Sequence, residues 1–391
     1  MNILCSALVV YGFKNIGMKK NVLFILAIVF LCACRQSDLA ATDDAIIVDS
    51  AESVCEDKTL MSAIFEVSNV ISLETSDSCL LGEIEKIIKR DGVIYVKSRN
   101  MPLTLFDEEG KFMHTVGKIG EGPEDYSMLV DFDIKDGKIY VQTIKKIQVY
   151  DPNGKWIETI PVELNVSGMR LVDDKILLFA LGDEHVIHLL DETGQKVKSL
   201  LERNQALRLS RSISFIKYGG CFLFPMGRSN DLLAYTLENG AFKRMSYLSS
   251  EQLSNEQEAT LIENNPKYRQ ELENRGCFDG LLTDNTHVMV PFIKKGDVTL
   301  WVKNINTSQT RAYKLSALEN DLTFSSVYSF FLDNIESDTA FLTYVTPYRL
   351  KEYLDEAKGK GESPCVEKLC EAVDRTKDEG NPILIEYKIK D

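Results

Sequence analysis

Two carboxylates placed two residues apart form the pattern in this sequence that is best suited to binding chemistry. The run Asp131-Phe132-Asp133 begins a short stretch that predicts a β-strand, so both acids project from one face of that strand. We expect it to be an inner strand beside a central channel. Paired carboxylates hold a cation or a polar ligand in some proteins. The alternative, which we favour, is solvated charge at the rim of a sheet.

A glycine-rich loop is the most distinctive local segment. It runs Gly117-Lys118-Ile119-Gly120-Glu121-Gly122-Pro123-Glu124-Asp125-Tyr126. Its glycines allow a backbone to approach a ligand closely. It opens no helix and lacks a Lys-Ser/Thr ending, so it is not a phosphate-binding loop. We favour a connector between sheets in which Tyr126 packs. As candidate ligand-binding residues we retain Gly120, Gly122, Glu124, Tyr126, Asp131 and Asp133.

Catalytic and metal-binding patterns are missing from the local sequence. His185 and His188 lie three residues apart in a predicted strand, so they point to opposite faces and cannot share one metal. There is no G-x-S-x-G elbow and no local Ser-His-Asp or Cys-His arrangement. We therefore predict no catalytic residue, no metal and no cofactor, although residues brought together from distant segments leave no local trace.

The first 33 residues predict a signal peptide. Met18-Lys19-Lys20 is a basic start, and residues 22–31 form an apolar run that is too short to cross a bilayer. Because residues 18–33 already form a complete leader, Met18 is a possible true start of translation. The segment Leu31-Cys32-Ala33-Cys34 resembles a bacterial lipobox, and this resemblance implies cleavage before Cys34 and its acylation. An ordinary secretory signal is the alternative.

Residues 34–58 read as a flexible tether, because they are polar and have no clear period. Composition supports a globular domain in the remaining residues 59–391, with 44% hydrophobic and 27% charged residues in the chain. The chain has 45 Lys plus Arg against 59 Asp plus Glu, a net charge of −14. Nucleic acid is therefore excluded as a partner, since phosphate binding needs a basic face.

A turn that ends in Gly, of the form Asp-x-x-Gly in three of its four copies, recurs every 40–46 residues. Each copy follows an earlier tight turn and a short apolar strand. The four copies are Phe106–Lys111, Tyr150–Lys155, Leu190–Gln195 and Leu237–Ala241. Four antiparallel strands in 40–45 residues match the size of one propeller blade. Two weaker units follow, near Asp284 and in residues 330–344, and they bring the expected number of blades to six.

The predicted fold is therefore an all-β, six-bladed β-propeller with short helical insertions. Capping and proline signals place these insertions at about residues 254–276 and 346–378. The end of the chain, Asn381–Ile389, predicts a strand, as do residues 64–73. A ring of sheets that does not close leaves bare strand edges. We therefore expect the N-terminal strand to complete the last blade beside the C-terminal strand.

Three features resemble six-bladed β-propeller lipoproteins of Gram-negative anaerobes, which are related to NHL and TolB-like propellers. They are the glycine-rich loop 117–126, the repeated Asp-x-x-Gly turn, and the closing Asn381-Pro382 before an apolar strand. Glu124-Asp125 stands where that group has Gly-Glu. The resemblance implies fold and location rather than an activity.

These observations predict a membrane-anchored protein of the cell envelope. The partners that we expect are the membrane, through the lipid on Cys34, and a peptide, glycan or partner protein bound by the propeller. We favour the outer over the inner membrane, because Arg35 stands where an Asp would argue for inner-membrane retention. One alternative is a propeller enzyme, a lyase or hydrolase, with its site in the central channel. Another is a purely structural envelope component.

Overall fold

A computed structural model describes one part of the chain. It covers residues 54–202 except 181, the backbone of four strands between 216 and 246, isolated positions from 266 to 284, and residues 286–390 with gaps at 305, 308, 328–334, 338–339 and 359–364. All of these residues belong to the unit Ala41–Asp391. The leader, Cys34, most of the tether and most of the predicted insertion 254–276 lie outside the described residues.

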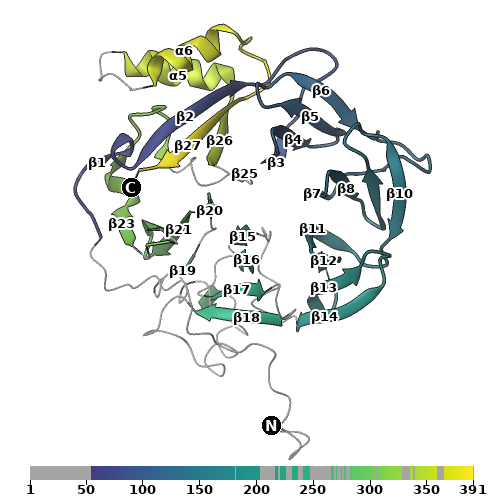
Figure 1. Ribbon diagram of the computed structural model, residues 1–391. Coiled ribbons are helices and arrows are strands. Elements are labelled where there is room, and N and C mark those ends of the chain that lie inside the picture. The colour runs from purple at the N-terminus through teal and green to yellow at the C-terminus, as the bar shows by residue number, and fades with distance from the viewer. Residues whose placement is uncertain are drawn as a thin grey trace, which may run out of the picture. The chain divides into compact units, whose positions relative to one another are not determined.

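The described residues form a β-propeller, in which small antiparallel sheets surround a common centre (Figure 1). The first blade contains β3 (Ile84–Arg90), β4 (Val93–Ser98), β5 (Leu103–Asp107) and β6 (Phe112–Val116). The second contains β7 (Asp131–Lys135), β8 (Lys138–Gln142), β9 (Lys146–Tyr150) and β10 (Trp156–Pro161). The third contains β11 (Val166–Val172), β12 (Lys175–Ala180), β13 (His185–Asp191) and β14 (Lys196–Glu202).

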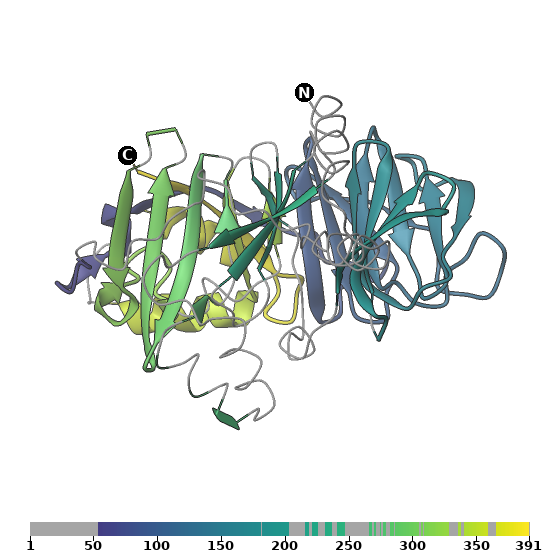
Figure 2. The ribbon, with the colours of Figure 1, turned by 90° about the horizontal axis from the view of Figure 1, so that it is seen from below.

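Two further blades follow along the chain. The fourth contains β15 (Ile216–Tyr218), β16 (Cys221–Pro225), β17 (Asp231–Thr236) and β18 (Ala241–Ser246). The fifth contains β19 (Cys277–Phe278), β20 (Leu282–Thr283), β21 (His287–Lys294), β22 (Asp297–Asn304) and β23 (Thr310–Lys314). Seen edge-on, the long strands of the fifth blade run side by side along the axis of the ring (Figure 2).

The closing sheet has three strands, and its two outer members flank the last strand of the chain. Its order is β2 (Phe65–Ser72), β27 (Ile383–Ile389) and β26 (Phe341–Val345). β2 and β27 pair antiparallel from Phe65 opposite Ile389 to Ser72 opposite Ile383. The predicted pairing of the two ends of the domain is thus confirmed.

The expected count of six full blades is wrong: the described residues form five blades of four or more strands, together with the three-stranded closing sheet. The reason lies in β25 (Ile335–Ser337), the segment that would give the closing sheet its fourth strand. β25 pairs parallel with β3 of the first blade instead, with Ile335 opposite Ile87. The first blade therefore gains the strand that the closing sheet lacks.

Two helices pack against the closing sheet on the outside of the ring (Figure 1). α5 (Pro347–Ala357) begins at Thr346, whose hydroxyl accepts a hydrogen bond from Arg349 N at 3.4 Å. α6 (Val366–Asp374) buries Leu369 and Ala372 in a core that also contains Ile383 and Tyr387. Short elements complete the chain: η2 (Met61–Ala63), η4 (Leu315–Ala317) and the parallel pair β1 (Thr59–Leu60) with β24 (Leu318–Glu319).

The recurring Asp-x-x-Gly turn has one geometry in the first three blades. In each, the Asp carboxylate accepts two backbone N–H bonds of 2.8–3.1 Å within the turn, and the Gly has a positive φ. Each Gly lies against the outer strand of the preceding sheet. The contacts are Gly110 with Ile71 and Ser72, Gly154 with His114 and Thr115, and Gly194 with Ile160 and Pro161. The repeat in the sequence is therefore a repeated contact between blades; Gly240 of the fourth copy lies outside the described residues.

Replacing a glycine in one of these turns tests the contact between blades. Gly194 has φ +86°, and a Cβ there would overlap Pro161 O and lie 2.8 Å from Ile160 Cγ2. Gly296 has φ +83°, and a Cβ there would meet no atom within 4 Å, so it carries the same backbone penalty without the contact. We expect Gly194→Ala to lower the free energy of unfolding by about 1–3 kcal/mol more than Gly296→Ala. Denaturant unfolding of both variants measures this difference, and equal losses would contradict the contact.

Candidate functional site

The carboxylates Asp131 and Asp133 tie three blades together at their inner edges. On the side of β3, Asp131 Oδ1 accepts a hydrogen bond from Lys86 Nζ at 2.8 Å, and Asp133 Oδ1 pairs with Arg90 Nη1 at 3.2 Å. On the side of β11, Asp131 Oδ2 accepts from Met169 N and Asp133 Oδ2 from Leu171 N, both at 2.9 Å. Both side chains are buried, so the favoured prediction of solvated rim charge is wrong.

The same network extends to the strands that close the ring. Arg170 of β11 hydrogen-bonds Glu336 of β25 and lies 3.6 Å from Asp131 Oδ2. Lys89 of β3 hydrogen-bonds Glu386 of β27 as a separate pair. Together these contacts involve four cationic and four anionic side chains, so their formal charges cancel. The cations are Lys86, Lys89, Arg90 and Arg170, and the anions are Asp131, Asp133, Glu336 and Glu386.

The ion pairs of this network shift the pKa values of its side chains in the direction that keeps them charged. Burial alone would raise the pKa of the Asp131 carboxyl, but the charges of Lys86 and Arg170 hold that pKa below its usual value. Burial alone would lower the pKa of Arg170, but the carboxylates of Glu336, Asp131 and Asp133 raise it. A general acid or base works best with a pKa near the operating pH. The pKa of Asp131 is lowered and the pKa of Arg170 is raised, so both side chains stay charged at neutral pH. This fits a structural role in holding the blades together.

The glycine-rich loop connects β6 to β7 and is held by the second blade. Gln148 Nε2 donates to Pro123 O at 2.9 Å and to Asp125 O at 3.0 Å, and the Tyr150 hydroxyl donates to Glu124 O at 2.8 Å. The Asp125 carboxylate accepts from Gly122 N at 3.1 Å and fills the space beside Gly120 and Gly122. The two glycines thus make room for this carboxylate, and the loop backbone is fixed from within.

Tyr126 is fully buried at the end of this loop. Its hydroxyl donates to Val116 O at 2.7 Å and accepts from Leu103 N at 3.0 Å. Both bonds are to the first blade, so Tyr126 packs as the connector hypothesis expects. Glu124 keeps an exposed side chain. The candidate residues therefore fall into two groups, the loop with Gly120, Gly122, Glu124 and Tyr126 and the inner edge with Asp131 and Asp133. A ligand-binding role for them stays a prediction.

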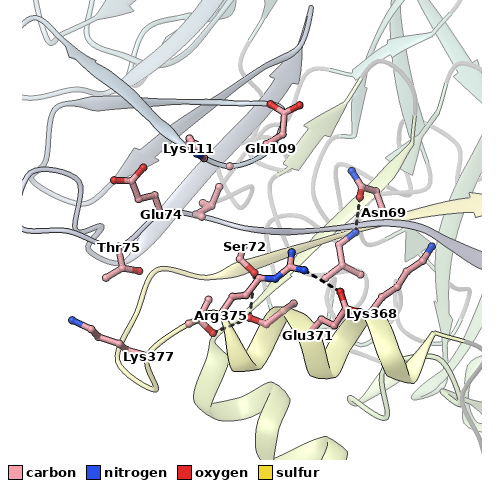
Figure 3. Close-up of a pocket in the computed structure, with 15 residues that line it drawn as sticks. Asn69, Ser72, Glu74, Thr75, Glu109, Lys111, Lys368, Glu371, Arg375 and Lys377 are labelled. Atoms are coloured by element: carbon pink, nitrogen blue, oxygen red, sulfur yellow. Dashed lines mark hydrogen bonds and ion pairs between the residues drawn. The ribbon is translucent and has the colours of Figure 1, made fainter.

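An open groove of about 770 Å³ lies on the outside of the ring, where the ends of the domain meet. Figure 3 shows β2 running between α6 and the turn that carries Glu109 and Lys111. β2 forms its floor, and the helix and the turn form its two walls. The lining residues are Asn69, Val70, Ser72, Leu73, Glu74, Thr75, Glu109, Gly110, Lys111, Lys368, Glu371, Ala372, Arg375, Thr376 and Lys377.

Part of the groove is fixed by hydrogen bonds between its walls and floor. Glu74 N donates to Gly110 O at 2.7 Å, and the Glu74 carboxylate accepts from Phe112 N at 3.1 Å. The Ser72 hydroxyl donates to Ala372 O at 3.3 Å, which joins the floor to α6. Sequence reasoning missed the groove because its three segments are far apart in the chain and none contains a binding motif.

A family match covers most of the chain. The family described as "Domain of unknown function (DUF4934)" matches residues 45–388. The chain belongs to this family. The comparisons show a β-propeller fold for this DUF4934 chain, as the resemblance implied, and do not show an NHL or TolB-like family. No curated protein matches the chain.

Solved structures similar to this DUF4934 chain include a putative exported protein from Bacteroides fragilis, at 16% identity and a TM-score of 0.69. The match covers 88% of this chain and all of that one, and it supports the propeller fold. A protein of unknown function from Bacteroides caccae matches at 12% identity and a TM-score of 0.37, over 57% of this chain and 78% of that one. The extracellular domain of a putative one component system from B. thetaiotaomicron matches at 18% identity and 0.33, over 64% and 29%.

Among the described residues of the DUF4934 chain, no group of three His, Cys, Asp or Glu side chains is arranged to hold a metal ion. Within the same residues, no helix combines the length and the apolar character needed to span a bilayer.

Removing the charge of Asp131 tests whether the inner network stabilises the ring. Asp131→Asn removes one of the two carboxylates shared by the buried cations Lys86 and Arg170, so we expect the free energy of unfolding to fall by about 3–5 kcal/mol at pH 7. Because the pKa of Asp131 is lowered in the folded state, its contribution is present above the unfolded pKa of about 3.9 and is lost as the pH falls through the folded value. Denaturant unfolding from pH 7 to 3 should therefore show the difference between wild type and variant shrinking.

The matched control is Asp174→Asn, which removes an exposed carboxylate paired with Lys175. Exposed ion pairs contribute little, so this variant should unfold like the wild type. If the free energy of unfolding falls no more for Asp131→Asn than for Asp174→Asn, or falls equally at every pH, the network does not hold the blades together.

Proposed function

We propose that this chain is an exported, lipid-anchored protein of the cell envelope whose propeller is a binding module for a peptide, glycan or partner protein. The observation that carries the binding function is the groove between β2, α6 and the turn Glu109–Lys111. It is open to solvent, its walls carry charged side chains, and its floor is the strand β2. Binding sites are commonly concave and largely preformed in this way.

Export and anchoring rest on the sequence. The basic and apolar leader, followed by the lipobox-like segment that ends at Cys34, supports cleavage before Cys34 and acylation of this residue. Arg35 favours the outer membrane in this proposal. The description of the Bacteroides fragilis relative as a putative exported protein agrees with export of this chain.

A screen of peptide and glycan arrays with the purified chain tests the binding function. Any ligand found should bind at least about tenfold more weakly to Lys368→Trp, because a bulky side chain on the wall narrows the groove. Lys198→Trp, at an exposed position of β14, is the matched control and should bind like the wild type. Uniform absence of binding, or equal binding by Lys368→Trp, would count against the groove as the binding site.

The lipid anchor has a separate test. Cys34→Ala removes the thiol that accepts the acyl chains, so we expect the protein to move from the membrane to the soluble fraction and to lose incorporation of labelled fatty acid. Cys55→Ala changes a cysteine beyond the leader and should leave both properties unchanged. Membrane association that survives Cys34→Ala would show that this residue is not the anchor.

A further inference from the structure

β2 is an edge strand of the closing sheet, and one of its backbone donors is bonded to a neighbouring side chain. It pairs with β27 on one side alone. Val70 N donates to the side chain of the preceding residue, Asn69 Oδ1, at 2.9 Å (Figure 3). This amide lies at the groove. A donor in that position is the group through which an extended peptide adds a strand to a sheet.

The groove is lined by four cationic and three anionic side chains. The cations are Lys111, Lys368, Arg375 and Lys377, and the anions are Glu74, Glu109 and Glu371. Glu371 is paired with Arg375 at 3.1 Å, and the Glu74 carboxylate accepts a hydrogen bond from Phe112 N. Glu109 lies on the wall formed by the turn, across β2 from α6. Within the described residues, no ion pair or hydrogen bond engages the ammonium groups of Lys111, Lys368 and Lys377. A protein with a net charge of −14 thus presents three unpaired cations at one groove.

We propose that the occupant of the groove is an extended acidic peptide that pairs with the outer edge of β2. This inference rests on the proposed binding function and names its ligand class. The peptide accepts a hydrogen bond from Val70 N through its backbone, in place of Asn69 Oδ1. Its acidic side chains meet Lys368 and Lys377 on the wall formed by α6 and the segment after it.

The dimensions of the groove agree with a short strand. α6 has nine residues, and at about 1.5 Å per residue it is roughly 14 Å long. An extended peptide rises about 3.3 Å per residue, so roughly four residues lie alongside the helix. Side chains of a strand alternate between its two faces, so acids at every second position all face the same wall. A short peptide in which acidic and apolar residues alternate fits this length and places all of its acidic side chains on one face.

The experiment uses a labelled hexapeptide of alternating aspartate and valine with blocked ends, and measures its binding to the purified chain by fluorescence anisotropy. We expect the double variant Lys368→Glu/Lys377→Glu to bind at least about tenfold more weakly, because both charge contacts become repulsive. Lys198→Glu, with the same charge change at an exposed site on β14, should stay within about twofold of the wild type. Asn69→Ala frees Val70 N, so it should bind as tightly as the wild type or more tightly.

Two further peptides separate charge from strand pairing. Replacing aspartate by lysine in the hexapeptide should abolish binding, and methylating alternate backbone nitrogens should weaken it at least about tenfold, because strand addition depends on main-chain hydrogen bonds. Binding that survives the double charge reversal or the backbone methylation overturns the inference. If neutral peptides or glycans occupy the groove and the acidic hexapeptide does not, this inference fails and the binding module stands. If no probe binds, both this inference and the proposed binding function fail.

Discussion

Two buried carboxylates with partners on both sides hold the inner edge of this propeller. Asp131 and Asp133 each contact the first blade through a cationic side chain and the third blade through a backbone amide. An unpaired buried charge is costly, so each contact depends on the others. The same network reaches β25 through Glu336, and a separate ion pair, Lys89 with Glu386, joins the first blade to β27. The closing strands are therefore fixed by charge as well as by strand pairing.

The outer part of the ring is held differently, by the Asp-x-x-Gly turns. Each of the three described turns places a glycine against the outer strand of the preceding sheet, where a side chain does not fit. The inner edge thus depends on charge pairs and the outer part on close backbone contact. Polar groups that take part in neither arrangement remain available for a ligand, and at the groove these include the three unpaired lysines.

Sequence reasoning predicted the features that repeat or that lie at the chain ends. The Asp-x-x-Gly turns indicated the blades, and the two terminal strands indicated how the ring closes. The burial of Asp131 and Asp133 was not predictable from Asp131-Phe132-Asp133, because Lys86, Arg170 and Glu336 come from distant segments that carry no motif. The blade count failed for a similar reason: a three-residue strand such as β25 has no pattern that tells which of two edges it will pair with.

The closure of the ring also explains why a groove exists where it does. In the closing sheet, whose order is β2-β27-β26, β2 pairs with β27 on one side only, and β2 is therefore its outer edge. α6 packs beside this edge and the turn Glu109–Lys111 of the first blade meets it, so the strand is walled on both sides without being covered. An exposed strand edge is a liability in most proteins. Here a helix, a turn and the Asn69 side chain limit access to it. The proposed occupant is therefore narrow and extended, and the lysines beside the edge are the reason for proposing that it is acidic.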